Sequence, residues 1–244
     1  MKIVFIGTSH GVPEANRRCS CAMLEIGENR YFVDMGTDPM PDLITRHISP
    51  DTVKGIFITH MHGDHTNGLP PFLELSSWYF KNTMPTVCLP EPMDKTVEAL
   101  RGWMKCNQTT MKDYTFMPVK EGVFYEDETV RVTAYRTKHI AESYSFLIEA
   151  EGKRVFFSGD LWPDGKGADF ATQVLDEPLD LAVCEGGHFE ATHYLPIFEN
   201  CENLKRLCIN HYTEYFLAET IELVDALKEK IPVCRVQDGT EIVI

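Results

Sequence analysis

Short apolar runs separated by glycine, proline and polar residues recur along the whole chain, and they predict a series of β-strands. The runs are rich in Val, Ile, Phe and Tyr, as half-buried or fully buried strands are. Gly27-Glu28-Asn29 and Gly152 each separate two such runs, where a hairpin can turn back. The predicted strands cover residues 2–6, 22–26, 30–34, 54–59, 86–89, 115–119, 129–137, 143–150, 154–158, 179–184, 207–210, 232–236 and 241–244.

Apolar residues at helical spacing predict helices between these strands. Val97, Leu100 and Met104, for example, would share one helix face. The predicted helices cover residues 39–48, 69–80, 91–105, 191–203 and 218–230. The strands form two groups, each with helices between them, which predicts an α/β fold of the αββα type: two mixed β-sheets packed face to face and flanked by helices. With 244 residues, 43% of them hydrophobic, we expect one domain over residues 1–244.

Composition narrows the class of partner. The formal net charge of −14 would repel long polyanions such as tRNA, and no Lys/Arg-rich segment offsets it, so a small-molecule substrate fits better. No apolar run approaches membrane-spanning length, and the first residues do not form a secretory signal, so we expect no membrane partner. The eight cysteines show no small-scaffold spacing and are typical of reduced thiols in a cytoplasmic protein. The oligomeric state, a homodimer included, stays open.

The segment from His60 to His65 carries the strongest chemical signal. Three imidazoles and one carboxylate follow the apolar strand predicted over residues 54–59. His60 and His62 can point the same way in an extended segment, while Gly63 can turn the chain and present Asp64 and His65 on another side. Such nitrogen and oxygen ligands suit zinc, and also manganese or iron. The segment can therefore serve two adjacent divalent metal ions.

Three more polar residues stand where predicted strands end, which is where sites are usually assembled. They are His139, Asp160 and His211. Taken singly, each has an ordinary structural explanation: a loop histidine, a turn residue and a strand-end side chain. Their significance depends on whether they meet the segment from His60 to His65.

The pattern His60-x-His62-x-Asp64-His65 after a strand resembles the signature of the metallo-β-lactamase-fold hydrolases. This resemblance implies the αββα sandwich and two metal ions that lower the pKa of a shared water and neutralise charge on the attacked phosphoryl or acyl centre. The ligands so implied are His60, His62 and His139 for one ion, Asp64, His65 and His211 for the other, and Asp160 as the bridge. Asp64 is also a candidate hydrogen-bond acceptor for the nucleophile. Zinc β-lactamases proper match less well, because they carry a cysteine at the position of Asp160.

Within this fold, the first 70 or so residues are similar to ribonuclease Z. The likeness rests on the segments 7–13, 34–36 and 68–70, together with the metal-binding pattern. The cyclic phosphodiesterases of phosphonate breakdown share the same scaffold. Ribonuclease Z holds tRNA with a long basic arm between the positions of His139 and Asp160, whereas here a hairpin accounts for that stretch. The resemblance therefore implies a hydrolase for a small phosphodiester, cyclic or nucleotide-derived, and argues against tRNA processing.

A further candidate catalytic residue is His188, at the predicted start of a helix in Cys184-Glu185-Gly186-Gly187-His188. It resembles the extra histidine that phosphodiesterase branches of the family place beside the leaving group, where it could stabilise a phosphoryl oxygen or protonate the alkoxide. His193 is the alternative, and the glycines before His188 favour the latter. Glu185 either orients a ligand histidine or simply ends a strand.

Several alternatives stay open. The same site could hydrolyse an ester, lactone or thioester, or the chain could be a metal-bound scaffold that binds a ligand without hydrolysing it. Some related phosphodiesterases carry a structural zinc on cysteines, but Cys19 and Cys21 alone cannot fill a tetrahedral site, so we expect ordinary thiols there. Residues 74–114, which include Trp78 and Trp103, either cover the site and set specificity or belong to the core.

Overall fold

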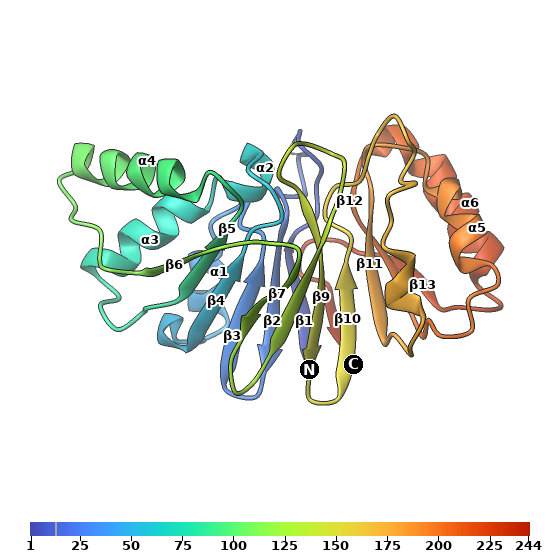
Figure 1. Cartoon of the computed structure of the whole chain (residues 1–244), viewed down its shortest axis with the longest axis horizontal. Helices are drawn as coiled ribbons and strands as arrows, with labels where there is room; N and C mark the ends of the chain where they lie inside the picture. The colour runs from blue at the N-terminus through green and yellow to red at the C-terminus, as the bar shows by residue number, and fades with distance from the viewer. Residues whose placement is uncertain (13) are drawn as a thin grey trace.

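The computed structural model describes residues 1–12 and 14–244 and shows two β-sheets packed face to face, with helices on both outer sides (Figure 1). Pro13, the last residue of the ribonuclease Z-like segment 7–13, lies outside the described residues. Each sheet contains seven strands, and each mixes parallel with antiparallel pairs. The predicted fold class is confirmed.

The first sheet contains strands of the N-terminal half and the last strand of the chain, in the order β14-β1-β2-β3-β4-β5-β6. β1 to β3 and β14 pair antiparallel, and β3 to β6 run parallel. The strands are β1 (Lys2–Gly7), β2 (Cys21–Ile26), β3 (Asn29–Val33), β4 (Val53–Phe57), β5 (Thr86–Leu89), β6 (Thr115–Pro118) and β14 (Glu241–Val243).

The second sheet has the order β13-β12-β11-β10-β9-β8-β7. β7 to β10 pair antiparallel and β10 to β13 run parallel. The strands are β7 (Gly122–Glu126), β8 (Arg131–Arg136), β9 (Tyr144–Ala150), β10 (Lys153–Phe157), β11 (Leu181–Gly186), β12 (Leu207–Tyr212) and β13 (Val233–Arg235).

Helices cover the outer face of each sheet (Figure 1). The α-helices are α1 (Met40–Thr45), α2 (Gly63–Thr66), α3 (Leu69–Trp78), α4 (Met93–Cys106), α5 (Leu195–Phe198) and α6 (Leu217–Leu227). Apolar residues of α1, α3 and α4 pack on the first sheet, and those of α5 and α6 pack on the second. No helix among the described residues combines the length and the apolar character needed to cross a membrane.

Both faces of the inner strands are buried, which explains why their sequences are continuously apolar rather than alternating. In β1, Ile3 and Phe5 point into the core between the sheets, whereas Val4 and Ile6 point toward the helices. In β10, Val155 and Phe157 face the other sheet and Phe156 faces the outer helices. Three apolar layers therefore hold the strand ends in fixed positions relative to one another.

The hairpin predicted between His139 and Asp160 is confirmed. β9 and β10 pair antiparallel, and their turn residues Glu151 and Gly152 have φ values of 53° and 70°. Two successive positive φ angles match the twist of a tight two-residue hairpin. Among the described residues, this hairpin and its flanking loops make up the whole stretch between His139 and Asp160.

The structure corrects five expectations. Strand β7 was not predicted. The helix expected over 191–203 is only a 3-10 turn (Ala191–Tyr194) followed by α5, where Pro196 can stand only in the first turn. His188 lies in a bend and does not start a helix, and His211 lies inside β12 rather than after it. The chain after His62 does not simply turn at Gly63 but forms the short helix α2.

Candidate metal centre

The candidate site residues gather at one edge of the sandwich, where several strands end (Figure 1). His60 and His62 follow β4, and Asp64 and His65 lie in α2. The remaining residues come from the second sheet: His139 follows β8, Asp160 follows β10, His188 follows β11, and His211 lies near the end of β12. Because β8, β10, β11 and β12 all run in the same direction, their carboxyl ends meet opposite β4 across the sandwich.

Three histidines and Asp160 form a first group of donor atoms that lie within 4.8 Å of one another. His62 Nδ1 is 3.1 Å from His60 Nε2 and 3.1 Å from His139 Nε2. Asp160 Oδ2 lies 3.5 Å from His60 Nε2 and 3.6 Å from His139 Nε2. The inward-facing nitrogens of three rings thus converge with one carboxylate oxygen.

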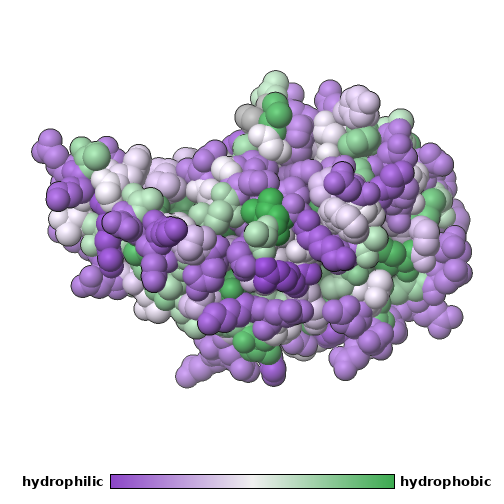
Figure 2. All heavy atoms as spheres, turned by 45° about the horizontal axis from the view of Figure 1, so that its top comes forward, coloured by the Kyte–Doolittle hydropathy of each residue, from purple (hydrophilic) through white to green (hydrophobic). Residues whose placement is uncertain are grey.

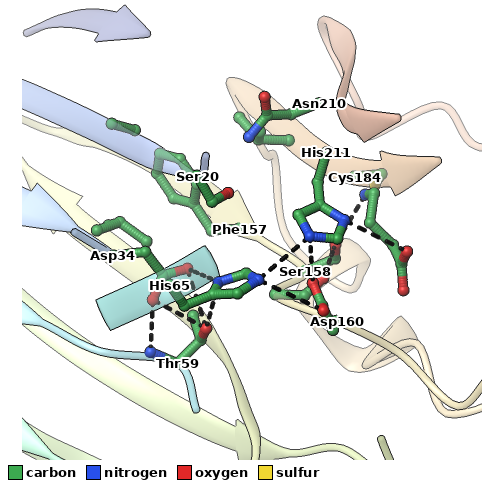
Figure 3. Close-up of a pocket in the computed structure, with 15 residues that line it drawn as sticks. Ser20, Asp34, Thr59, His65, Phe157, Ser158, Asp160, Cys184, Asn210 and His211 are labelled. Atoms are coloured by element: carbon green, nitrogen blue, oxygen red, sulfur yellow. Dashed lines mark hydrogen bonds and ion pairs between the residues drawn. The ribbon is translucent and has the colours of Figure 1, made fainter. Parts of the chain in front are cut away.

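A second group of donor atoms contains Asp64, His65, His211 and again Asp160. His65 Nε2 and His211 Nε2 are 3.2 Å apart, and Asp64 Oδ2 lies 3.1 Å from His211 Nε2. Asp160 contributes Oδ2 at 3.4 Å from His65 and Oδ1 at 3.6 Å from His211. Figure 3 shows His65, His211 and Asp160 pointing toward one another. These three residues line a small cavity of about 30 Å³. Asp160 belongs to both groups and also to a third, which contains Glu185, His188 and His211.

Hydrogen bonds behind the histidines hold two of the rings in place. Asp34 Oδ2 accepts from His65 Nδ1 at 2.7 Å, which leaves His65 Nε2 facing the other donors. Thr59 Oγ1 lies 3.1 Å from His60 Nδ1 and also donates to Asp34. A carboxylate that binds the second ring nitrogen in this way orients a histidine for metal binding. Asp34 was not predicted as a site residue, although it follows a buried strand just as Asp160 does.

Gly159 and Gly187 place the two residues that follow them. Gly159 has a φ of 56°, and a Cβ atom there would lie 2.6 Å from the Tyr144 carbonyl oxygen. A Cβ at Gly187 would lie 2.6 Å from the His211 carbonyl oxygen. Only glycine fits at these two positions, because any side chain would collide with the neighbouring backbone. The close approach of the backbone there sets where Asp160 and His188 lie.

The donor set fits divalent cations. Asp160 Oδ1 is buried without a hydrogen-bond partner among the described residues, and the Nε2 atoms of His65 and His211 face each other at 3.2 Å. Buried polar atoms are normally satisfied, and ring nitrogens rarely face one another unless a cation lies between them. Imidazole nitrogens with carboxylate oxygens are the donors that zinc prefers, and they also suit manganese and iron. The residues could therefore hold divalent metal.

The charges of these residues point the same way. Burial lowers the pKa of His60 well below its usual value. Burial also acts to lower the pKa of His65, but Asp160 and Asp34 raise it well above the usual value. Burial alone would raise the pKa of Asp160, yet His211 and His65 lower it well below the usual value. The carboxylates thus stay ionised and attract any nearby cation.

His188 lies at the open side of these groups. Its Nδ1 is 2.7 Å from Glu185 Oε2 and 3.8 Å from Asp160 Oδ2, and its ring stacks on His211. Burial alone would lower its pKa, but the hydrogen bond to Glu185 raises the pKa to about 9. Glu185 also lies 3.9 Å from His211 Nδ1. By contrast, His193 contacts Glu190 and Phe189 and belongs to none of the donor groups found among the described residues.

Cys19 and Cys21 also stay outside every donor group found among the described residues, and both are free thiols. Cys19 is half-buried and Cys21 is buried in the core under the first sheet. Burial raises the pKa of both thiols, which disfavours the thiolate that zinc needs. That these cysteines are ordinary thiols stays a prediction.

Known proteins are similar to this chain in sequence and in fold. Ribonuclease Z of Listeria innocua serovar 6a is 30% identical over 200 residues, which cover 80% of this chain and 64% of that protein. The matched region spans between 47% and 64% of the length of the curated ribonucleases Z compared. The short form of human tRNase Z has a TM-score of 0.76 at 19% identity and covers 100% of this chain and 99% of its own. The metallo-β-lactamase-fold protein YhfI from Bacillus subtilis has a TM-score of 0.73 at 17% identity, with 99% and 98% covered.

These comparisons confirm the resemblance to metallo-β-lactamase-fold hydrolases of the ribonuclease Z branch. A family model described as Anti-Pycsar protein Apyc1 matches residues 1–176. The match contains every candidate donor from His60 to Asp160 and ends before His188 and His211. Because it covers well over half of the sequence, the chain belongs to the Anti-Pycsar protein Apyc1 family, and it has the metallo-β-lactamase fold.

Proposed function

We propose that this chain is a dinuclear metal-dependent phosphodiesterase that hydrolyses a small phosphodiester, cyclic or nucleotide-derived. The observation that carries the proposal is that two groups of histidine and aspartate donors share Asp160, with His188 beside them. The ribonuclease Z relatives support the reaction class, because their name describes cleavage of RNA, itself a phosphodiester.

In this proposal His60, His62 and His139 hold one ion, Asp64, His65 and His211 hold the other, and Asp160 contacts both. The ions are two zinc ions, with manganese or iron as alternatives, because the donors are nitrogen and oxygen atoms. When bound, such ions lower the pKa of water and offset charge on phosphoryl oxygens. Asp34 and Thr59 keep the histidine rings in the required orientation.

His188 is the proposed partner of the leaving group. Glu185 occupies its Nδ1 at 2.7 Å, so Nε2 is the nitrogen left to meet a substrate oxygen. A hydrogen bond or proton from Nε2 would stabilise the departing alkoxide. Asp64, 12% exposed at its side chain, is the proposed hydrogen-bond acceptor for the nucleophile.

The size and charge of the chain support a small substrate. The net charge is −14, and hydrophilic side chains dominate the face shown in Figure 2. Residues 140–159 form a hairpin and its loops, which leaves no insertion there among the described residues to hold tRNA. A cytoplasmic location and a small-molecule substrate are part of the proposal, which holds for a monomer or a homodimer.

Part of the segment 74–114 lies beside the proposed site. Trp103 is 41% exposed, whereas Met104 of the same helix is fully buried in the core. A cleft of about 540 Å³ is lined by Trp103, by Met61 between the histidines 60 and 62, and by Thr66 of α2. This supports a role for Trp103 in substrate specificity and a core role for Met104.

The test is turnover of bis-p-nitrophenyl phosphate beside a p-nitrophenyl ester and a lactone. The protein is first analysed for metal content and then saturated with zinc or manganese. Asp160→Ala serves as the inactive control, and His193→Ala serves as a matched histidine replacement outside the donor groups. Preferential diester cleavage supports the proposal, and cyclic mononucleotides, linear dinucleotides and a tRNA precursor are then compared.

Two outcomes would contradict the proposal. Preferential ester, lactone or thioester cleavage with two ions bound would keep the fold and the donors but change the substrate class. A fully metal-loaded protein without any hydrolytic activity on these panels would instead indicate a scaffold that binds its ligand without hydrolysing it.

A further inference from the structure

Cys208 and Cys234 form a pair of neighbouring thiols away from the proposed metal centre. Cys208 lies in β12 and Cys234 in the edge strand β13, and they stand directly opposite each other in the parallel pairing of these strands. Their sulfur atoms are 2.9 Å apart. Cys208 is buried in the core between the sheets, and Cys234 is half-buried at its margin. No other two cysteines among the described residues make a sulfur contact.

The surroundings of the pair make the two thiols unequal. Hydrogen bonding between the two sulfur atoms lowers the pKa of Cys234 below its usual value. The positive charge of Arg206 acts in the same direction on both sulfurs. Cys234 is also the more accessible of the two. A thiolate beside a cation and partly open to solvent is the kind that oxidants attack first, whereas a buried thiol stays inert until a partner sulfur reaches it.

We propose that Cys208 and Cys234 are a redox-active dithiol that hydrogen peroxide converts into a reversible disulfide within the chain. Directly opposed residues on neighbouring strands are close enough for such a bond, which requires Cα atoms roughly 4.4–6.8 Å apart. The site is independent of the phosphodiesterase reaction, since neither thiol belongs to the donor groups of the metal centre.

The reaction balances with peroxide as the oxidant. The Cys234 thiolate attacks one peroxide oxygen and breaks the O–O bond, and the released hydroxide takes a proton, so Cys234 becomes a sulfenic acid. The Cys208 sulfur then attacks the Cys234 sulfur, loses its proton, and expels the sulfenic oxygen as water. In total, two thiols and one hydrogen peroxide give one disulfide and two waters. A small dithiol reduces the bond again by exchange.

The proposed disulfide would link β13, a strand with little support, covalently to its neighbour. β13 has only three residues, all half-buried, and it pairs with one neighbour at the edge of the second sheet. That neighbour, β12, also carries His211, three positions beyond Cys208. Oxidation therefore ties the edge strand to the strand that supplies a donor of the metal centre.

The experiment treats the folded wild-type protein with a small excess of hydrogen peroxide, blocks free thiols with N-ethylmaleimide, and maps cysteines by mass spectrometry after non-reducing digestion. We expect a cross-linked peptide that joins Cys208 to Cys234 and a loss of two titratable thiols. Dithiothreitol should restore both thiols. Cys106→Ser is the matched control, because Cys106 is an exposed lone thiol and its removal should leave the cross-link unchanged.

A second variant tests the order of attack. In Cys208→Ser, we expect Cys234 to stop at the sulfenic acid, which dimedone traps, whereas wild type gives little trapped product. The proposal is overturned if folded wild type keeps both thiols alkylatable after peroxide. It is equally overturned if Cys234 is found linked to Cys106 of a second molecule, or if Cys234 is oxidised to sulfinic acid without a cross-link.

Discussion

His65 Nδ1 lies 2.7 Å from Asp34 Oδ2 and donates a hydrogen bond to it. The two residues belong to different elements: Asp34 follows β3, and His65 lies in α2. Asp34 Oδ1 also accepts from the backbone N–H of Thr59 at 2.8 Å. This one buried carboxylate therefore joins the end of β3 to the metal-binding segment and fixes which nitrogen of His65 faces the other donors.

Replacing Asp34 with Asn should weaken metal binding about 10–100-fold, as expected when the partner of a ligand histidine is lost. Asparagine tolerates the φ of 57° at this position, so the backbone should be retained. Affinity is measured by competition with a chromophoric chelator. Asp127→Asn, in a turn that does not contribute to any donor group, is the control and should bind metal like wild type. Wild-type affinity in Asp34→Asn would show that His65 does not need this orientation.

Asp160→Ala should remove bound metal and diesterase activity together, because all three donor groups found among the described residues contain this carboxylate. Metal content is determined by elemental analysis after gel filtration, and circular dichroism checks that the protein is folded. A variant that retains two ions per chain would exclude a bridging role for Asp160.

His188→Ala should leave metal content unchanged and lower phosphodiester turnover about 100-fold, the size expected for loss of an acid–base group. The side chain contacts Glu185 and stacks on His211, and it belongs to a third donor group with Asp160, Glu185 and His211 but to neither group that contains His65 or His139. Steady-state kinetics on a metal-saturated protein give the measurement. His193→Ala should keep wild-type turnover. If His188→Ala turns over as fast as wild type, the leaving group does not depend on it.

Removing metal should lower the melting temperature, because ions that bind only the folded chain stabilise it by mass action. At 100 times the dissociation constant, this amounts to about 2.7 kcal/mol per site. The protein is dialysed against a chelator, melted, and melted again after zinc is restored. In Asp160→Ala the melting temperature should no longer respond to zinc. A wild-type melting temperature that is independent of metal would argue that no metal binds the folded state tightly.

Asp127 makes part of the stability pH-dependent. Its carboxylate accepts from the hydroxyls of Tyr31 and Tyr125 at 2.8 and 2.9 Å, and from backbone N–H groups of the same turn. Burial alone would raise the pKa of Asp127, but these hydrogen bonds lower it below the usual 3.8. Because the pKa of Asp127 is lower in the folded state, its ionised carboxylate stabilises the fold at pH values above the unfolded-state pKa. This stabilisation is lost as the pH falls through the folded-state pKa.

Asp127→Asn should therefore cost about 1 kcal/mol near neutral pH, a small value because the carboxylate is solvent-exposed. The difference from wild type should shrink as pH falls from about 5 to 3. Urea unfolding at several pH values gives the free energies. A difference that stays constant with pH would contradict the proposed ionised acceptor.

Local patterns in the sequence were enough to predict much of this protein. Continuous apolar runs predicted most strands because the inner strands are buried on both faces, and glycine marked the hairpin turns between β2 and β3 and between β9 and β10. The histidine spacing from 60 to 65 predicted a metal site, since such donors stay close in space through their chain connection alone. The extent of the chain as one domain and the roles of the donor residues stay predictions.

Tertiary structure decided what depends on contacts between distant segments. Strand β7 was missed although Val123, Phe124 and Tyr125 favour a strand, and its pairing with β8 places it at the edge of the second sheet. Asp34 becomes a site residue only because β3 ends beside α2, and Cys208 meets Cys234 only through the register of β12 and β13. His139, Asp160 and His211 each looked ordinary in sequence. They meet because the sandwich brings the ends of separate strands to one edge. The spacing of these residues along the sequence does not show how close the strand ends lie in the fold.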